Sequence, residues 1–519
     1  MNSEWLYLSA SQLLIQLKNG SISSRALLET YISRINVKNP AVNAVVAMNL
    51  EKARARADEA DAARARGESW GVLHGLPITI KDTFEVPDMP CTAGAPEFRH
   101  YFPKQAAAAV QRLIDEGAIV FAKTNVPLFA SDVQSYNKIY GTTNNPWNLR
   151  YTPGGSSGGA AAALAAGFTA LELGSDIGGS IRTPAHFCGV YGHKPTHGII
   201  SLRGHIPGPP NTQKTPDLAV AGPMARTAED LALMLDVVVG ANPDDAIAWQ
   251  IKLPKAKQKT LQDFRVLLWI DDSLCPIDNE MRQIYLSLFE KLKAAGVNVQ
   301  IGAPLGMSLN TFYPLYLRQL GSVMALSQST LQRNLMGVAA PVLAKVGKYV
   351  KAPPLFENFL QGMAQSYANW HYGHEHSLRL RKKFSQVFNE YDVILMPPTP
   401  STTIPHQQKP EMPQRRITVN GEQRSYTELF TWIAPATLLG LPATSAPLGI
   451  TRSGLPVNIQ IMGARFHDKT TIKFASLLSK LMGGFTPPPL MSSLEEHISP
   501  SVTYFKSSPL LLKGGRYCS

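Results

Sequence analysis

The sequence predicts an α/β fold built around a central sheet. Short apolar runs alternate with segments of helical period between about residues 75 and 174. The same alternation returns between residues 263 and 300, and two further apolar runs follow at 391–400 and 454–463. Alternating strand and helix units are typical of α/β folds, because each unit buries its apolar face against the next.

The first seventy residues have the apolar spacing of helices. Leu13 and Leu17, and later Leu28, Tyr31 and Ile35, recur at steps of three and four residues. This spacing places the apolar side chains on one face of a helix. We therefore predict two surface helices here and assign residues 1–70 to N-terminal helices packed on the core.

Strand and helix signals alternate after this region. Residues 75–86 (GLPITIKDTFEV) predict a strand followed by a turn, and residues 106–127 predict a helix, a glycine turn and a buried strand. Residues 160–173 predict another helix that leads into a strand. Residues 263–271 then predict a strand, and residues 279–300 a helix closed by glycine before a short strand.

Two segments differ from this pattern. Residues 305–385 are apolar and basic with helical spacing, and we interpret them as helices packed on the core. A lid over a pocket and an amphipathic patch that faces a membrane are the alternatives. Residues 487–519 lose their periodicity and predict a flexible C-terminal tail.

Composition narrows the class of protein. The chain has 519 residues, 44% hydrophobic and 17% charged, which is typical of a globular protein. No secretory signal opens the sequence, and no apolar run approaches the roughly 20 residues of a membrane-spanning helix. The four cysteines are scattered without the spacing of a disulfide scaffold or a zinc site. We therefore expect a soluble, cytoplasmic protein without a structural metal.

The formal charge of +12 raises the question of an anionic partner. The basic residues are spread along the chain, with local clusters at 54–66, 252–259 and 379–383. Acidic residues interleave with the first cluster at helical spacing, which is typical of a solvated helix face. Because no recognition motif accompanies these clusters, we expect no nucleic-acid partner.

A glycine- and serine-rich stretch at 152–167 (TPGGSSGGAAAALAAG) stands out. Composition alone would suit a flexible linker. A phosphate-binding loop would need a lysine that this run does not supply. Gly154 to Gly158 also spell G-x-S-x-G, but a nucleophile elbow needs a buried strand directly before it, and the preceding residues are polar and contain two prolines.

A third interpretation uses more of the chain. Ser180 lies in a second glycine-flanked motif at 174–185 (GSDIGGSIRTPA), and Lys81 ends a predicted apolar strand. Burial lowers the pKa of a lysine, so the neutral amine of Lys81 can act as a general base. Ser156 can relay a proton between this base and a serine nucleophile. The backbone N–H groups of residues 177–180 can bind an oxyanion.

These three motifs together resemble the amidase signature family of Ser-cisSer-Lys hydrolases. Agreement extends over about residues 5–490, for example in GVYGHKPTHGIIS (189–201) and GLPATSAPLG (440–449). The resemblance implies a central mixed, twisted sheet covered by helices on both faces. It also implies an amidase domain over residues 71–486, with the helical segment 305–385 as an insertion.

The resemblance implies roles for individual residues. Ser180 would be the acylated nucleophile, Ser156 would lie in a cis peptide bond and relay the proton, and Lys81 would be the base. The N–H groups of Ile177, Gly178, Gly179 and Ser180 would form the oxyanion hole. Ser157 would support the network by hydrogen bonding, and Asp176 and Arg182 would order the nucleophile loop.

The implied reaction is hydrolysis of an amide C–N bond through an acyl-enzyme, with no metal or organic cofactor. His186, His193 and His197 follow the nucleophile and suggest a Ser-His-Asp site. A Ser-His-Asp site would leave Lys81 and both glycine motifs without a function. We therefore expect the three histidines to be surface or loop residues.

The resemblance leaves the substrate open. The glutaminase component of the tRNA-dependent amidotransferase, a member of the family, has a loop similar to GSDTGGSIRQPA, whereas this chain has Ile177 and Thr183. Both differences favour a free-standing amidase, similar to the fatty-acid-amide hydrolases, that acts on a small-molecule amide. The alternatives are that glutaminase subunit or a non-catalytic assembly subunit. A homodimer and peripheral contact with a membrane are left open.

Overall fold

An eleven-stranded mixed sheet forms the centre of the computed structural model, which describes residues 3–206, 212–347, 349, 352–489 and 491. Its strands lie in the order β1-β3-β2-β6-β8-β7-β14-β15-β11-β9-β10. The strands β2, β3 and β6 run parallel, as do β9, β10 and β11, while the strands between these groups pair antiparallel. Their bounds are Val45–Met48 (β1), Pro77–Lys81 (β2), Ile119–Thr124 (β3), Leu171–Asp176 (β6), Tyr191–Lys194 (β7), Val220–Ala225 (β8), Arg265–Leu268 (β9), Asn298–Ile301 (β10), Val393–Met396 (β11), Ala443–Ile450 (β14) and Pro456–Gly463 (β15).

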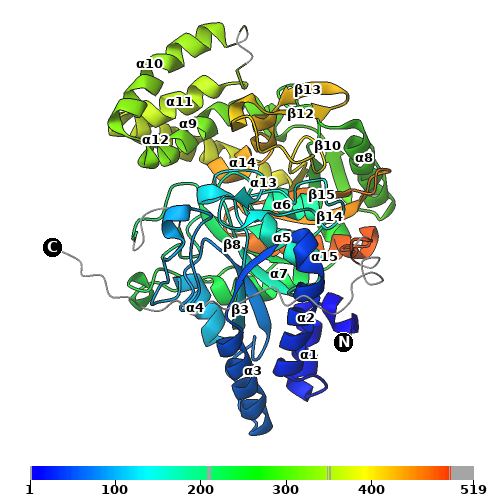
Figure 1. The fold of residues 1–519 in the computed structure, drawn as a ribbon. Coiled ribbons are helices and arrows are strands. Elements are labelled where there is room, and N and C mark those ends of the chain that lie inside the picture. Colours follow the sequence, from blue (N-terminus) through cyan, green and yellow to red (C-terminus); the bar gives the residue numbers. More distant parts are fainter. Residues whose placement is uncertain (1–2, 207–211, 348, 350–351, 490, 492–519) are drawn as a thin grey trace, which may run out of the picture.

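Helices cover both faces of this sheet, which confirms the predicted fold class (Figure 1). The short helices α5 (Gly158–Ala165) and α6 (Arg182–Cys188) pack on one face, and α7 (Ala228–Val238) and α15 (Asp468–Met482) pack together on the other. Successive side chains of a strand point to opposite faces. Accordingly, Met224 of β8 joins the core under α5 and α6, while its neighbour Ala225 joins the core under α7.

The N-terminal region contributes more than the two helices that we predicted. It forms α1 (Ala10–Asn19), α2 (Ser24–Val42) and α3 (Leu50–Ala65), and between the last two lies β1, which pairs antiparallel with β3. The Asp230 carboxylate on α7 accepts hydrogen bonds from the N–H groups of Ala10 and Ser11. This end of the chain is therefore part of the central sheet and its core.

The remaining predicted strands and helices between residues 75 and 300 are present. The helix predicted before β3 is α4 (Ala108–Asp115), and the helix predicted before β10 is α8 (Asn279–Ala294). Two small antiparallel pairs accompany the main sheet: β4 (Tyr136–Asn137) with β5 (Gly141–Thr142), and β12 (Arg416–Val419) with β13 (Glu422–Ser425). The short helices α13 (Val387–Glu390) and α14 (Ala434–Leu438) precede β11 and β14.

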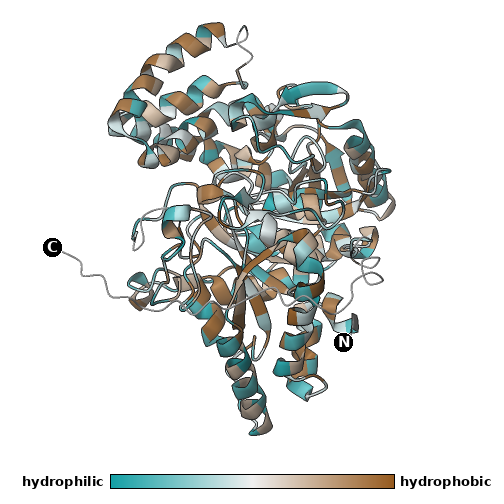
Figure 2. Ribbon diagram, viewed as in Figure 1, coloured by the Kyte–Doolittle hydropathy of each residue, from teal (hydrophilic) through white to brown (hydrophobic). Residues whose placement is uncertain are grey.

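The segment 305–385 is helical, as predicted. It forms α9 (Tyr313–Met324), α10 (Thr330–Val346), α11 (Phe356–Ala364) and α12 (Tyr367–Phe384), which project together from the body of the molecule (Figure 1). The helix α9 is inserted into the core with buried Tyr313 and Tyr316, and α12 reaches the same core with buried Leu380 and Phe384. The outermost helix α10 carries apolar residues along its length (Figure 2). Its exposed apolar side chains include Leu335, which is 60% exposed, and Val338, which is 70% exposed. Core packing therefore explains α9 but not the outer face of α10.

Residues 492–519, which make up most of the predicted C-terminal tail, lie outside the described part of the chain. Within the described part, no helix is both long enough and apolar enough to cross a lipid bilayer. The described cysteines Cys91, Cys188 and Cys275 are buried and unpaired.

Candidate active site

Lys81 lies at the end of β2, in the centre of the molecule, with its side chain fully buried. Its Nζ donates hydrogen bonds to Ser156 Oγ at 2.7 Å and to Ser175 Oγ at 2.9 Å. Burial lowers the pKa of Lys81 to about 7, although the nearby carboxyls of Asp176 and Glu172 act in the opposite direction. A large share of the amine is therefore neutral near pH 7, as a general base requires.

The glycine- and serine-rich stretch contacts Lys81 through Ser156 shortly before α5 begins. Its Gly155–Ser156 peptide bond is cis. Ser135 holds this stretch, because its hydroxyl donates to Gly154 O at 3.1 Å and accepts from the N–H of Gly158 at 3.1 Å. A Cβ atom at Gly155 would lie 2.5 Å from the backbone oxygen of Asp132, so only glycine fits there.

The turn between β6 and α6 is organised by Asp176. Its carboxylate forms an ion pair with Arg182 at 2.8 Å and accepts the N–H groups of Gly179 and Ile181. Burial favours the neutral acid, but the guanidinium of Arg182 and these N–H donors outweigh it and lower the pKa of Asp176. A charged and fully paired aspartate therefore fixes the backbone on both sides of Ser180.

Arg182 connects the turn to the C-terminal half of the chain by hydrogen bonds. Its guanidinium donates to Ile433 O at 3.0 Å, to Gln460 Oε1 at 2.6 Å and to Thr437 Oγ1 at 2.7 Å. Both members of the Asp176–Arg182 pair are fully buried. The turn is thus attached to α14 and β15.

Ser180 lies directly beside the serine-rich stretch. Its carbonyl oxygen accepts a hydrogen bond from the N–H of Ser157 at 3.1 Å. The residue is buried but keeps 7% of its surface exposed to solvent. Ser157 Oγ also contacts the backbone of Ser175, donating to its oxygen at 3.3 Å. These bonds bring the turn after β6 and the start of α5 together.

One of the four N–H groups predicted to form an oxyanion hole already has a hydrogen-bond partner. The N–H of Gly179 already donates to Asp176 Oδ1 at 3.0 Å. No hydrogen bond within the described residues occupies the N–H groups of Ile177, Gly178 and Ser180. A binding site for an oxyanion at this turn would therefore use these three donors.

Aromatic and apolar side chains surround the turn. A Cβ atom at Gly178 would lie 3.1 Å from the Phe430 ring and 3.4 Å from Tyr316 Oη, and one at Gly179 would lie 3.2 Å from the Ile433 side chain. Tyr316 on α9 also donates to Ile177 O at 3.2 Å. The projecting segment thus reaches the candidate site through α9.

Two further serines belong to the cluster but were not predicted. Ser175 is the second hydroxyl on Lys81, and Ser135 supports the glycine-rich stretch. Ser175 sits next to Asp176 in the second motif, and this proximity was the available signal. Ser135 lies in a polar loop, and no pattern in the sequence distinguishes it.

Two of the three histidines are not the surface or loop residues that we expected, whereas His197 does lie in the turn that follows β7. His186 lies in α6 and His193 in β7, and both are fully buried. His193 is bonded to Asp468 and Thr444, and burial lowers the pKa of His186 to about 4. His186 accepts the N–H of Asn458 at 2.8 Å. Their ring nitrogens bond to groups outside the lysine–serine cluster, so packing between β7, β15 and α15 accounts for them.

A buried lysine bonded to serine hydroxyls in an α/β fold is typical of hydrolases that use an activated serine. A family model described as Amidase matches residues 26–472, which is most of the chain. The protein therefore belongs to the amidase family and is a hydrolase that acts on carbon–nitrogen bonds.

The similar proteins include amidotransferase subunits and solved amidases. A glutamyl-tRNA(Gln) amidotransferase subunit of Synechococcus sp. (strain CC9902) is 31% identical over 89% of this chain and 93% of its own length. A solved amidase is 27% identical with a TM-score of 0.73, covering 92% of this chain and all of its own. A bacterial aryl acylamidase shares the fold, with a TM-score of 0.75 and 23% identity over 94% of this chain and 97% of its own.

Proposed function

We propose that the protein is an amidase that cleaves small-molecule amides through an acyl-enzyme on Ser180. The observation that supports this most strongly is the buried Lys81 amine, 2.7 Å from Ser156 Oγ in a segment that is bonded to Ser180. A neutral amine and a relay hydroxyl are what a serine nucleophile needs for activation. The reaction needs no metal or organic cofactor.

In the first half of the reaction, Ser180 Oγ attacks the amide carbonyl while its proton passes to Ser156, whose own proton moves to Lys81 Nζ. The carbonyl oxygen becomes an oxyanion that the N–H groups of Ile177, Gly178 and Ser180 stabilise. The proton then returns from Lys81 through Ser156 to the leaving nitrogen, and the C–N bond breaks. Amine or ammonia leaves, and the acyl group stays on Ser180.

In the second half, water attacks the acyl-enzyme and gives up a proton along the same path. The oxyanion forms again at the same donors and collapses, which releases the carboxylate and restores Ser180. Ser157, Asp176 and Arg182 do not exchange protons in this scheme. Their bonds hold the two serine segments in register.

Tyr316, Phe430 and Ile433 beside the turn support an apolar or aryl substrate. A second candidate is the glutaminase subunit of a tRNA-dependent amidotransferase, which the names of the curated relatives favour. The two candidates share the acyl-enzyme and differ in substrate.

The first experiment is labelling with a fluorophosphonate probe. We expect the intact protein to be labelled, Ser180→Ala to lose labelling completely, and Ser156→Ala and Lys81→Ala to react at least a hundredfold more slowly. Ser201→Ala is the matched control, since Ser201 is 6% exposed and Ser180 7%. Full labelling of Ser180→Ala would place the nucleophile elsewhere, and an unreactive intact protein would revive the non-catalytic alternative.

A substrate panel then separates the two candidates. We expect faster turnover of an anilide and of a medium-chain acyl amide than of glutamine, measured without any added protein partner. Turnover of glutamine alone would favour the glutaminase candidate and would leave the serine mechanism intact.

A further inference from the structure

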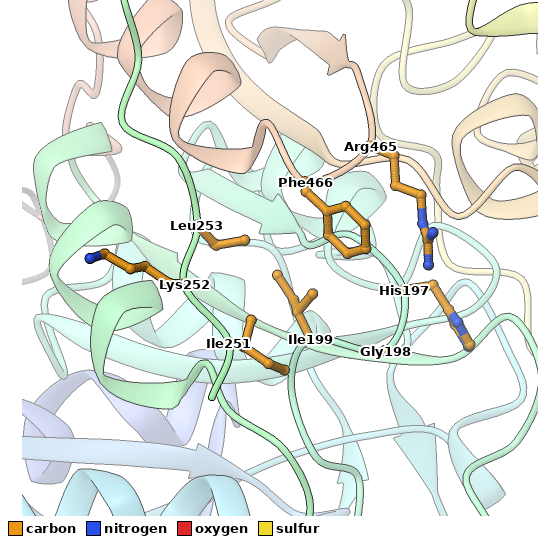
Figure 3. A pocket seen from close by; sticks show the side chains of 8 residues that line it. All are labelled: His197, Gly198, Ile199, Ile251, Lys252, Leu253, Arg465 and Phe466. Carbon is orange, nitrogen blue, oxygen red and sulfur yellow. The ribbon is translucent and has the colours of Figure 1, made fainter. Parts of the chain in front are cut away.

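A separate cavity of about 500 Å³ lies between the end of β7, the segment around residue 252 and the loop that joins β15 to α15 (Figure 3). None of its lining residues belongs to the lysine–serine cluster. Its volume is in the range of small-molecule sites. The proposed amidase mechanism gives this cavity no role.

One side of the cavity is apolar. Ile199, Ile251, Leu253 and Phe466 turn their side chains toward one another there (Figure 3). Phe466 is 39% exposed, although burial of such a ring is favourable. Its backbone also has a φ of 67°, a left-handed conformation that is uncommon for a bulky residue. Thr196 Oγ1 accepts the N–H of Phe466 at 2.9 Å and helps to hold this conformation.

The other side of the cavity is cationic. The Arg465 guanidinium lies over the Phe466 ring, 4.2 Å from its centroid, and points toward His197 (Figure 3). Arg465 forms no ion pair or hydrogen bond with its side chain among the described residues. Burial and the positive charge of Arg381 lower the pKa of Arg465. Two arginines are thus close enough to repel each other.

His197 adds an unsatisfied polar atom. Its Nε2 is buried without a hydrogen-bond partner in the described structure. Burial, together with the charge of Lys194, lowers the pKa of His197 to about 4, so the ring is neutral near pH 7. The carboxylate of Asp217, which acts on the pKa of this ring in the opposite direction, accepts a hydrogen bond from Trp370 Nε1. His197 therefore lines the cavity as a neutral group, next to the cationic Arg465.

We propose that this cavity binds a small carboxylate that carries an apolar group. The carboxylate pairs with Arg465, and the apolar group packs against Ile199, Leu253 and the Phe466 ring. A guanidinium binds a carboxylate through two parallel N–H donors, which a single arginine can supply. A bare phosphate would satisfy the cations and leave the apolar half of the cavity unfilled.

The test uses the full chain and 4-phenylbutyrate as the probe, with binding measured by titration calorimetry. We expect saturable binding of 4-phenylbutyrate and at least tenfold weaker binding of 4-phenylbutanol, which lacks the charge. The variant Arg465→Gln should bind 4-phenylbutyrate at least tenfold more weakly than the intact protein does. Arg452→Gln is the matched control, because Arg452 is also exposed but lies outside the cavity.

A diazirine derivative of the same acid locates the site independently of catalysis. We expect its crosslinks on peptides that contain residues 251–253 or 465–466, both in the intact protein and in Ser180→Ala. Crosslinks confined to peptides around Ser180, equal affinity for the acid and the alcohol, or unchanged binding in Arg465→Gln would each overturn the proposal. Inorganic phosphate that displaces the acid with equal affinity would also contradict it, since the apolar side would then contribute nothing. None of these outcomes bears on whether Ser180 is the nucleophile.

Discussion

Lys81 sets the pH dependence that the proposed mechanism requires. Its pKa is lowered to about 7, so the active, neutral amine is fully formed above that pH and is lost as the pH falls. We predict that kcat/KM decreases about tenfold per pH unit below pH 7 and is level above it. Rates on an anilide between pH 5 and 9 measure this. A limb near pH 10 instead would mean that the amine is charged in the folded protein, and Lys81→Arg should be inactive throughout.

Ser175 offers a finer test at the same site. A hydroxyl that accepts from Lys81 favours the charged ammonium, and its removal lowers the pKa of Lys81 further. We therefore predict that Ser175→Ala moves the acid limb of the pH profile to lower pH. We also predict that it reduces kcat about fivefold, which corresponds to the loss of one hydrogen bond of about 1 kcal/mol. Ser175→Thr, which keeps the hydroxyl, should restore both. If the acid limb of the pH profile did not move, the Ser175 hydroxyl would have no effect on the pKa of Lys81, and the residue would serve packing alone.

The sequence predicted some of these contacts and not others. Lys81 and Ser156 lie in two of the motifs whose combination predicted that these residues are close together. In the structure their side chains are hydrogen-bonded. Ser175 was missed because its contact depends on which strands are neighbours. The strands β2 and β6 pair in parallel with Ile80 opposite Leu173, although β3 lies between them in the chain. Local patterns predict a strand, but not the register between strands distant in sequence.

At the scale of elements, the turn from β6 to α6 depends on one buried ion pair. Asp176→Asn would leave Arg182 charged and uncompensated in the interior. We predict a loss of about 3–5 kcal/mol in the free energy of unfolding, measured by urea denaturation. Combining Asp176→Asn with Arg182→Leu should recover part of this loss. If the double variant were less stable than the sum of both single losses, the charge pairing would not be the cause.

The projecting helix α10 has one packed face and one free face. Leu335 and Val338 are largely exposed, whereas Ala340 is 1% exposed. We predict that Leu335→Ser with Val338→Ser leaves hydrogen exchange across residues 330–346 unchanged. Ala340→Leu overfills the packed face and should accelerate exchange there, at a cost of about 1–3 kcal/mol. Equal effects of both changes would mean that the outer face is covered in solution.

The N-terminal helices show where periodicity misleads. Their apolar spacing predicted surface helices, and α1, α2 and α3 are present. The same spacing could not show that the short segment Val45–Met48 between them joins the sheet beside β3. A four-residue strand carries too little pattern, and its pairing is a tertiary contact.

For the whole molecule, one continuous core joins both ends of the described chain. It includes Leu28 on α2 and Phe474 on α15, far apart in sequence. We predict that Leu28→Ala lowers the free energy of unfolding by about 2–5 kcal/mol and shifts tryptophan fluorescence and activity together in urea. The control Ile15→Ala, at a side chain 64% exposed, should change stability by less than about 0.5 kcal/mol. Separate transitions would show that residues 1–70 unfold as an independent unit.

The bonds from Arg182 to Ile433, Thr437 and Gln460 have a consequence for biosynthesis. The lysine and both serines of the candidate site emerge from the ribosome within the first 180 residues. The groups that attach Arg182 to the C-terminal half, at residues 433, 437 and 460, emerge about 250 or more residues later. A growing chain therefore carries all of its reactive groups long before it can hold them in place. Competence arises only near the end of translation, and prematurely terminated chains should be inert.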